Sequence, residues 1–346
     1  MKLPIKPVYL PMEATQANEI PRGSEWQYEP KWDGFRCLVF REGDAVELQS
    51  KSGQPMARYF PELVEAVREL EPEQFVLDSE IVIPSGEGVS FDDLLMRIHP
   101  AASRIRRLAA ETPGILIVFD ILVDANGELV ANQSLHQRRE LLTRFAQRYL
   151  KDQKSIRLSP MTTDYAVAKR WFGTTGSTLD GIVAKRVDLS YRSGERTGMR
   201  KIKRIETVDC VVGGFRYATG KREVGSLLLG LYDLDGLLHH VGFTSGIKAS
   251  ERAALTAKLA DYIKEPGFTG RAPGGPSRWS TERSTQWVPL APKLVVEVSY
   301  DHFTGGRFRH GTRLLRWRPD KNPRQCTMDQ VERPHSRSLR LLDKAS

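Results

Sequence analysis

The stretch from Tyr28 to Phe40, YEPKWDGFRCLVF, places Lys31 next to Trp32 and just before an Asp-Gly turn and a bulky apolar run. An isolated lysine is most often a surface charge or a salt-bridge member. To act as a nucleophile it must lose its proton, which costs about 4 kcal/mol at neutral pH unless burial or nearby cations favour the neutral amine. The aromatic and apolar neighbours favour such burial, so the stretch indicates a reactive lysine.

The rest of the chain has the composition of a globular protein with more than one domain. It has 346 residues, of which 40% are apolar and 8% aromatic, and this length favours two domains with separate cores. No apolar run reaches the roughly 18 residues of a membrane span. Prolines interrupt the N-terminal stretch MKLPIKPVYLPMEA, which excludes a secretory signal of the usual kind, and we expect a cytoplasmic protein.

Cysteine usage and charge narrow the class further. Cys37, Cys210 and Cys326 show no CxxC spacing, so buried thiols are expected in place of a disulfide framework or a zinc site. The net charge is +9, and most of the basic excess lies in residues 206–346. Such an excess favours a polyanionic partner such as nucleic acid, although charge alone also serves solubility.

The first 205 residues combine helices and strands. The runs Phe75–Ile83 and Ile115–Val123 are β-rich and apolar, as expected for buried strands. Pro61–Leu70 and Ser134–Leu150 show helical spacing, with a proline suited to the first turn of one and a capping serine at the start of the other. We therefore predict a mixed α and β domain.

Beyond residue 205 the pattern changes to short strands. One hairpin is predicted at Asp235-Gly236, one amphipathic helix at Ser250–Lys264, and a Gly- and Pro-rich loop over 266–292. Short strands with one inserted helix are typical of an OB-fold. The segment 331–346 is polar and indicates no clear element.

Charged residues recur on the strands in pairs. Asp78 and Glu80 lie two apart and so share one face, where they could be an ion-pair anchor or oxygen ligands for Mg²⁺ or ribose. Lys201 and Lys203 also share one face of a strand, and two positive charges placed so close together are suited to binding an anion. Asp180 and Lys185 lie five apart and would point to opposite sides of an ideal strand. Both can serve one site only if the chain is irregular near Gly181, and we predict such an irregularity.

Taken together, these residues form a set that handles phosphate: a nucleophilic amine, carboxylates for Mg²⁺, and lysines that balance charge on a phosphoryl group. The reaction that fits is attack of a lysine on the α-phosphate of a nucleotide.

The motifs that carry this chemistry resemble, in order, those of the ATP-dependent DNA ligases. They are EPKWDGFR, SKSG, LDSEIV, VFDIL, LDGIVAKR and RKIK, and they run from Glu29 to Lys203. The resemblance is greatest to the bacterial stand-alone ligase C type and to the ligase domain of bacterial ligase D. It implies an α+β fold in which an adenylation (nucleotidyltransferase) domain of antiparallel sheets with helices, residues 1–205, precedes an OB-fold β-barrel, residues 206–330. A polar tail, residues 331–346, would follow.

The resemblance also implies a reaction and a set of roles. Lys31 would attack ATP to give lysyl-AMP, AMP would pass to the 5′-phosphate of a nick, and the 3′-hydroxyl would displace it. Mg²⁺, or Mn²⁺ in its place, would be the cofactor, nicked double-stranded DNA the partner, DNA repair the setting, and the enzyme a monomer. The implied contacts are Glu29 with adenine, Phe119 stacked on the base, Arg36 and Lys51 with the phosphates or the DNA end, Glu80 with ribose or metal, Asp180 with metal, and Lys185, Lys201 and Lys203 with the α-phosphate.

The chain departs from the family pattern in three places. Lys51 stands where an arginine is usual, so a bidentate phosphate contact is lost. Asp180 stands where glutamate is common. The stretch Arg309–Lys321 resembles the motif that orients the pyrophosphate but lacks its Phe-Pro pair. In this stretch the candidates for the leaving group or for DNA are Arg313, Arg316, Arg318 and Lys321.

Two rival functions stay open at this level. An RNA-capping guanylyltransferase or an RNA ligase would share the lysine motif and the two-domain plan. A catalytically inactive nucleic-acid-binding protein would keep only the basic OB domain, and the intact Lys31, Glu80 and Lys203 count against it. The pair His239-His240 has no third ligand at suitable spacing and is expected to be structural.

Overall fold

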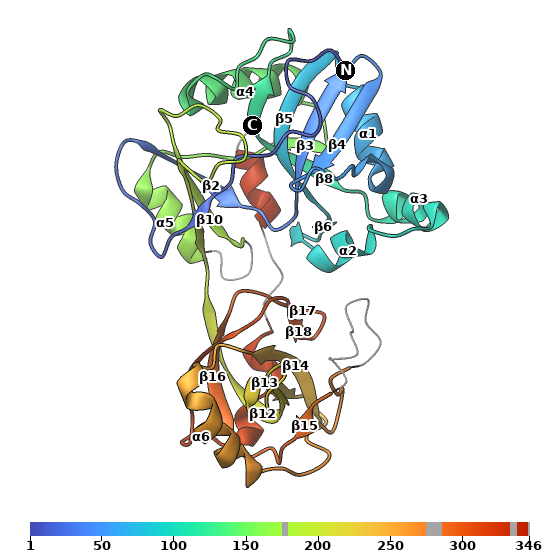
Figure 1. The fold of residues 1–346 in the computed structure, drawn as a ribbon. Coiled ribbons are helices and arrows are strands. Elements are labelled where there is room, and N and C mark those ends of the chain that lie inside the picture. Colours follow the sequence, from blue (N-terminus) through green and yellow to red (C-terminus); the bar gives the residue numbers. More distant parts are fainter. Residues whose placement is uncertain (175–178, 275–285, 333–337, 345–346) are drawn as a thin grey trace. The chain divides into compact units, whose positions relative to one another are not determined.

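The computed structural model describes residues 1–174, 179–274, 286–332 and 338–344, which form two compact units (Figure 1). Unit 1 comprises Met1–Arg204 together with the C-terminal segment that starts at Arg333, and unit 2 comprises Ile205–Glu332. The chain therefore leaves unit 1, forms unit 2 and returns to unit 1. Among the described helices, none combines the length and the apolar character needed to cross a bilayer.

Unit 1 contains two main sheets and most of the helices. Its strands are β1 (Thr15–Gln16), β2 (Trp26–Lys31), β3 (Phe35–Glu42), β4 (Ala45–Ser50), β5 (Gln74–Val82), β6 (Pro84–Ser85), β7 (Gly88–Val89), β8 (Ile115–Val123), β9 (Ile156–Leu158), β10 (Gly181–Arg186) and β11 (Met199–Lys203). Its helices are η1 (Ala57–Tyr59), α1 (Pro61–Arg68), α2 (Phe91–Met96), α3 (Ala102–Glu111), α4 (Leu135–Tyr149), α5 (Tyr165–Thr174) and η4 (Ser338–Lys344).

The larger sheet has the strand order β4-β3-β5-β8-β9 and is buried on both faces. On one face Val39, Leu77 and their neighbours pack against Leu63 of α1 and Phe145 of α4. On the other face alternate residues of the same strands, such as Leu38, meet the N-terminal segment and β11. Successive residues of a strand point to opposite faces, and because both faces are covered, β5 and β8 are buried along almost their whole length.

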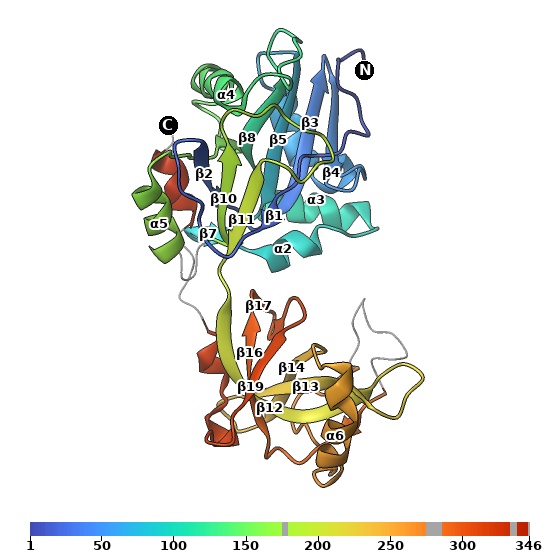
Figure 2. The same cartoon turned by 60° about the vertical axis from the view of Figure 1, so that its left-hand side comes forward.

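The smaller sheet has the order β1-β11-β10-β2, and α5 packs against β2 and β10 (Figure 2). Their contact is apolar, with Tyr28 and Ile182 of the strands against Ala168 of the helix. The start of α4 is also as predicted, because Ser134 forms a capping box with Gln137.

In its described residues, unit 2 is a strongly bent sheet with one α-helix and two short 3₁₀ helices. Its elements are β12 (Glu206–Tyr217), β13 (Val224–Tyr232), β14 (Leu238–Thr244), α6 (Ala249–Ala260), β15 (Val288–Pro289), β16 (Val295–Tyr300), β17 (Phe303–Thr304), β18 (Arg307–Phe308), β19 (Arg313–Trp317), η2 (Pro323–Gln325) and η3 (Met328–Gln330). The order is β14-β13-β12-β16-β19, with β15 also on β12. The two edges meet through one bridge, Thr244 to Thr312. The barrel is therefore partly open, as is usual for an OB-fold, and not closed by a continuous ladder.

Two expectations need adjustment, and a third can be checked only in part. Helix α6 ends at Ala260, four residues before the predicted Lys264, because the backbone of residues 262–264 pairs with residues 289–291 instead. The predicted Asp235-Gly236 turn lies within a five-residue loop between β13 and β14, in which Gly236 has a φ of +75°. Part of the predicted loop 266–292, residues 275–285, lies outside the described residues.

The C-terminal segment differs most from expectation. We expected a polar tail without regular structure from residue 331, but residues 338–344 form η4 and belong to unit 1. The reason is the spacing of apolar residues: Leu342 is only 2% exposed, and Leu339 and Leu341 are partly buried beside it. All three cysteines are buried and free, as predicted.

One prediction concerns the response of unit 2 to acid. His240 on β14 packs edge-on against Phe268, and its buried Nε2 has no hydrogen-bond partner among the described residues. Burial, together with the positive charges of Arg216, Arg271 and Arg307, lowers the pKa of His240 to about 4. The unfolded chain takes up a proton near pH 6.5, so the histidine stabilises the fold above that pH, and this stability is lost as the pH falls towards 4.

Urea unfolding at pH 7 and pH 5 measures this effect. Between these two values the wild type should lose about 2 kcal/mol of unfolding free energy through His240, and His240→Leu should not show that loss. His136→Gln, at an exposed histidine of α4, is the control and should behave as the wild type. An equal acid loss in the wild type and in His240→Leu would contradict the prediction.

Candidate active site

The site is built on the pairing of three neighbouring strands. Gly181, the first residue of β10, is paired with Lys31 at the end of β2 on one side and with Lys203 at the end of β11 on the other. Asp180 therefore enters between the two lysines. Its carboxylate forms an ion pair with Lys31 and lies 3.8 Å from the Nζ of Lys203. Its backbone N–H also donates to the carbonyl of Lys31, at 3.1 Å.

Gly181 supplies the predicted irregularity. Its φ is +141°, a conformation that residues with a side chain rarely adopt. A Cβ at this position would collide with the carbonyl oxygen of Ile202 in β11. Because Gly181 approaches β11 so closely, Asp180 can turn towards Lys31 before the regular strand begins.

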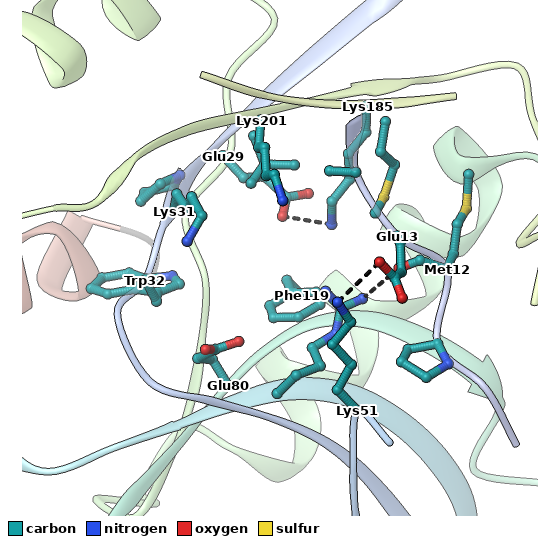
Figure 3. Close-up of a pocket in the computed structure, with 16 residues that line it drawn as sticks. Met12, Glu13, Glu29, Lys31, Trp32, Lys51, Glu80, Phe119, Lys185 and Lys201 are labelled. Carbon is teal, nitrogen blue, oxygen red and sulfur yellow. Dashed lines mark hydrogen bonds and ion pairs between the residues drawn. The ribbon is translucent and has the colours of Figure 1, made fainter. Parts of the chain in front are cut away.

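Beside this junction is a cavity of about 190 Å³ (Figure 3). The residues predicted from the sequence that line it come from six strands and one loop: Glu29, Lys31, Arg36, Lys51, Glu80, Phe119, Lys185 and Lys201. The rest of the lining consists of the N-terminal residues 11–14, Pro30, Trp32, Val183 and Met199. Asp180 and Lys203 join the site through their ion pairs with each other and with Lys31.

At the base of the cavity an aromatic ring lies between cations. The Nζ of Lys185 and the Cζ of Arg36 each lie 4.6 Å from the ring centroid of Phe119. Lys185 also forms an ion pair with Glu29, at 2.7 Å, and the amide of Gln27 donates to the other oxygen of Glu29, at 2.7 Å. The flat face and the fixed carboxylate together suit recognition of a planar base.

Arg36 is held by a buried hydrogen-bond network, which the motifs did not predict. Its Nε and Nη2 donate to the two carboxylate oxygens of Asp78 at 2.5 and 2.6 Å. The hydroxyl of Tyr191 donates to the same carboxylate, at 2.6 Å, and accepts from the backbone N–H of Met12, at 3.0 Å. Burial raises the pKa of Tyr191 well above its usual value, so it stays a hydrogen-bond donor. Most of the Arg36 fork is thus bound to protein, and its contact with phosphate or DNA stays a prediction.

The outer cations have acidic partners too. Lys51 pairs with Glu13 at 2.9 Å, and Arg196 approaches the same carboxylate at 3.3 Å. The bond to Lys51 holds the pKa of Glu13 below its usual range. Burial lowers the pKa of Lys201, and the charges of Lys31 and Lys203 lower it further. The mouth of the cavity is therefore rich in positive charge.

No local signal marked Glu13 or Tyr191, because each is far along the chain from the motif residue it contacts. Gln27 lies only two residues before Glu29 on β2, but it precedes the motif that begins at Glu29 and was not predicted. Asp78 carried a signal as one of two carboxylates on an apolar strand, and the ion-pair reading left open for it is the one that the structure shows. The other member, Glu80, faces the cavity.

Glu80 and Asp180 are the two carboxylates that could hold a metal ion. Among the described residues there is no group of three or more His, Cys, Asp or Glu that could do so. Two carboxylates nevertheless suit Mg²⁺, which keeps several waters and takes further oxygens from phosphates. Burial raises the pKa of Glu80 to about 7, against the opposing charges of Lys31 and Arg36. Its anionic form is therefore incompletely stabilised, and a cation in the cavity would supply what is missing.

The basic residues of the C-terminal motif lie in unit 2 and have partners there. Arg316 pairs with Glu297 at 2.6 Å, and Arg318 pairs with Asp209 at 2.9 Å. Lys321 lies 3.7 Å from the same Asp209. Their contact with a leaving group stays a prediction.

Comparison with known proteins adds an independent line of evidence. A family model described as "ATP dependent DNA ligase domain" matches residues 11–203, and one described as "ATP dependent DNA ligase C terminal region" matches residues 220–321. The chain is 42% identical to "DNA ligase C2" of Mycolicibacterium smegmatis, with 98% of this chain and 99% of that protein covered. It is 41% identical to "DNA ligase C" of Mycobacterium tuberculosis, with 98% of each chain covered.

A solved structure described as "DNA binding with a minimal scaffold: Structure-function analysis of Lig E DNA ligases" has a similar fold. Its TM-score is 0.55 at 16% identity, and the match covers 89% of this chain and 99% of that chain. At this identity the likeness shows the fold alone.

The geometry at the strand junction predicts a large cost for one added methyl group. Gly181→Ala should lower the unfolding free energy of unit 1 by about 2 to 4 kcal/mol, because the new Cβ meets a backbone oxygen and strains φ. Gly173→Ala in α5 is the matched control, since open space surrounds that position and alanine favours helix. Thermal unfolding of both variants checks this, and equal midpoints would contradict it.

Proposed function

The chain belongs to the family of ATP-dependent DNA ligases and is a DNA ligase that uses ATP, and from this premise we propose that Lys31 is its nucleophile. The observation that carries the proposal is the junction of β2, β10 and β11. It brings the amine of Lys31, the carboxylate of Asp180 and the amine of Lys203 together beside the cavity that contains Phe119.

In the first step the Nζ of Lys31 attacks the α-phosphorus of ATP. A P–N bond forms, the bond to the bridging oxygen breaks, and pyrophosphate leaves. The attacking amine must be neutral and must leave its ion pair with Asp180 before it attacks. Asp180 thus holds the lysine in place between reactions. Lys201 and Lys203 would balance the negative charge of the α-phosphate during transfer.

The base would bind where the cavity offers a flat ring and a fixed hydrogen-bond acceptor. Phe119 supplies the stacking face and Glu29 the acceptor. Lys185 is held against both, so it can turn from Glu29 towards a phosphate oxygen without a large movement of the backbone. Arg36 lies over the ring of Phe119 and supports it, while the ion pair with Asp78 holds Arg36 in place.

Glu80 and Asp180 would hold Mg²⁺, or Mn²⁺ in its place. Bound there, the ion would neutralise both carboxylates and polarise phosphate oxygens. Because Asp180 contacts Lys31 directly, its engagement with a cation would also release the amine of Lys31 from this ion pair.

In the second step an oxygen of the DNA 5′-phosphate attacks the adenylate phosphorus and Lys31 leaves as the amine. In the third step the 3′-hydroxyl attacks the 5′-phosphate, the phosphodiester forms, and AMP leaves.

The proposal also covers the substrate, the setting and the roles of the two units. The substrate would be nicked double-stranded DNA, the setting DNA repair, and the enzyme a cytoplasmic monomer. Unit 1 would be the adenylation domain and unit 2 the DNA-binding OB domain. Arg316 and Arg318 would approach the pyrophosphate from unit 2.

An RNA-capping guanylyltransferase would differ in the nucleotide it accepts. Incubation with labelled ATP or labelled GTP, followed by a denaturing gel, separates the two. Label from ATP that a nicked duplex removes supports a DNA ligase, whereas label from GTP alone would favour capping.

The first functional prediction concerns the nucleophile. After treatment with ATP and Mg²⁺, mass spectrometry should find one AMP on Lys31 and none after chelation of the metal. Lys31→Ala should abolish the adduct yet still seal a nick that already carries AMP, because the third step does not use the amine as nucleophile. Lys151→Ala, at an exposed lysine of unit 1, should keep the adduct. An adduct on another side chain would refute the assignment.

The second functional prediction concerns salt. If basic residues of unit 2 contact about four phosphates, affinity for a nicked duplex should fall about a hundredfold between 50 and 200 mM salt. Arg313→Gln, at an exposed arginine of β19, should reduce the slope of log affinity against log salt by about one. Arg106→Gln, at an exposed arginine of α3, is the control. Fluorescence anisotropy measures both, and a slope near zero would argue against backbone contacts.

A further inference from the structure

The C-terminal helix η4 is fixed to unit 1 by polar and apolar contacts. The backbone N–H of Leu339 donates to the carbonyl of Glu87, at 2.9 Å, and the Nε of Arg340 donates to the carboxylate of Glu87, at 2.7 Å. Leu342 is almost fully buried. Asp343 adds only an exposed pair with Arg157, at 3.2 Å. The segment is therefore docked chiefly through its leucines.

Leu342 joins a small apolar cluster, which we call the floor cluster. It consists of Leu342 and four residues from elsewhere in unit 1, namely Trp32, Val82, Ile117 and Leu179. All five are less than 9% exposed. The cluster is separate from the main apolar cores of the unit.

Each of the four partners lies one or two residues in sequence from a residue of the active site. Trp32 follows Lys31, and Leu179 precedes Asp180. Val82 lies two residues after Glu80 on β5, and Ile117 lies two residues before Phe119 on β8, so each pair shares a face of its strand. The tail thus supplies the one member of the floor cluster that lies outside the segment from Glu29 to Lys203, which carries the motifs.

Trp32 connects the tail with the cavity. Its indole N–H donates to the hydroxyl of Ser159, at 3.0 Å, and the carbonyl of Ser159 accepts from Arg139, at 2.6 Å. The ring also lines the cavity beside Lys31, with the C-terminal ribbon close to it (Figure 3). The hydrogen bond fixes the N–H edge of the indole, and the rest of the ring is held by apolar packing within the floor cluster, which includes Leu342.

We propose that Leu342 is a positioning residue: by completing the floor cluster, the docked tail holds Trp32 and Leu179, and through them Lys31 and Asp180, in the arrangement needed for AMP transfer. The inference rests on the proposed role of Lys31. It concerns a segment beyond the residues 11–203 and 220–321 that the family models match. A gap left by Leu342 would let the indole and the adjoining lysine move, and small displacements of a nucleophile slow a reaction strongly.

The test measures single-turnover transfer of AMP from ATP to Lys31 in the full-length protein. Leu342→Asp should lower the maximal rate constant about ten- to a hundredfold and change the ATP concentration for half-maximal rate less than about twofold. Leu342→Met, of similar volume, should keep the rate within about threefold. Asp343→Ala, which removes only the exposed pair with Arg157, should behave as the wild type.

A second measurement keeps the proposal testable if Leu342→Asp folds poorly. Leu342→Ala, Trp32→Phe and the double variant form a cycle of rate constants. If the leucine acts through the tryptophan, the double variant should be no more than about twice as slow as the slower single variant. Thermal unfolding first sets an assay temperature at which all three variants are folded.

The outcomes separate this inference from the proposed function. If the wild type carries AMP elsewhere than on Lys31, the proposed nucleophile is wrong. If the wild type labels Lys31 and Leu342→Asp does so at the same rate, or loses only affinity for ATP, the positioning role is overturned. It is also overturned if the effects of Leu342→Ala and Trp32→Phe multiply in the double variant.

Discussion

The close approach of three strands at Gly181 is the constraint on which the rest of the site depends. Only a residue without a side chain can lie this near the carbonyl of Ile202 with a positive φ. Because Gly181 lies so close to β11, the first residue of β10 aligns with the last residues of β2 and β11. Lys31, Asp180 and Lys203 therefore meet at one corner of the smaller sheet. The larger sheet then needs only to present Glu80 and Phe119 to that corner.

The charges of the cavity are arranged as pairs. Besides Lys31 with Asp180, the structure pairs Lys185 with Glu29, Lys51 with Glu13, and Arg36 with Asp78. Burial of a charge without a partner is costly, so a cavity with this many ionised groups must compensate them internally before substrate arrives. A nucleotide brings its own negative charge and a metal its positive charge, and the pairs can then be redistributed among protein, substrate and ion. Arg36 is the exception, because Tyr191 also donates to its partner Asp78 and holds it in place.

The sequence allowed prediction of those features that depend on short spacings. The strand Ile115–Val123, the capping serine of α4 and the irregularity at Gly181 follow from neighbouring residues, and each is found. The features that were missed depend on contacts between distant segments. Tyr191 donates a hydrogen bond to Asp78, which lies 113 positions away in the sequence, and Glu13 forms an ion pair with Lys51 of the SKSG motif. The leucines of the tail looked like part of a polar segment because their partners are more than 150 positions away.

The path of the chain has a consequence for how the two halves can be exchanged or cut. Unit 2 is an insertion, since the polypeptide enters it after Arg204 and re-enters unit 1 with η4. A protease that cleaved once between Arg204 and Ile205 would therefore leave two fragments that still share the apolar cluster around Leu342. For the same reason, a chimaera that borrowed its barrel from a relative would need two splice points, and one that ended with the barrel would lack part of the adenylation half.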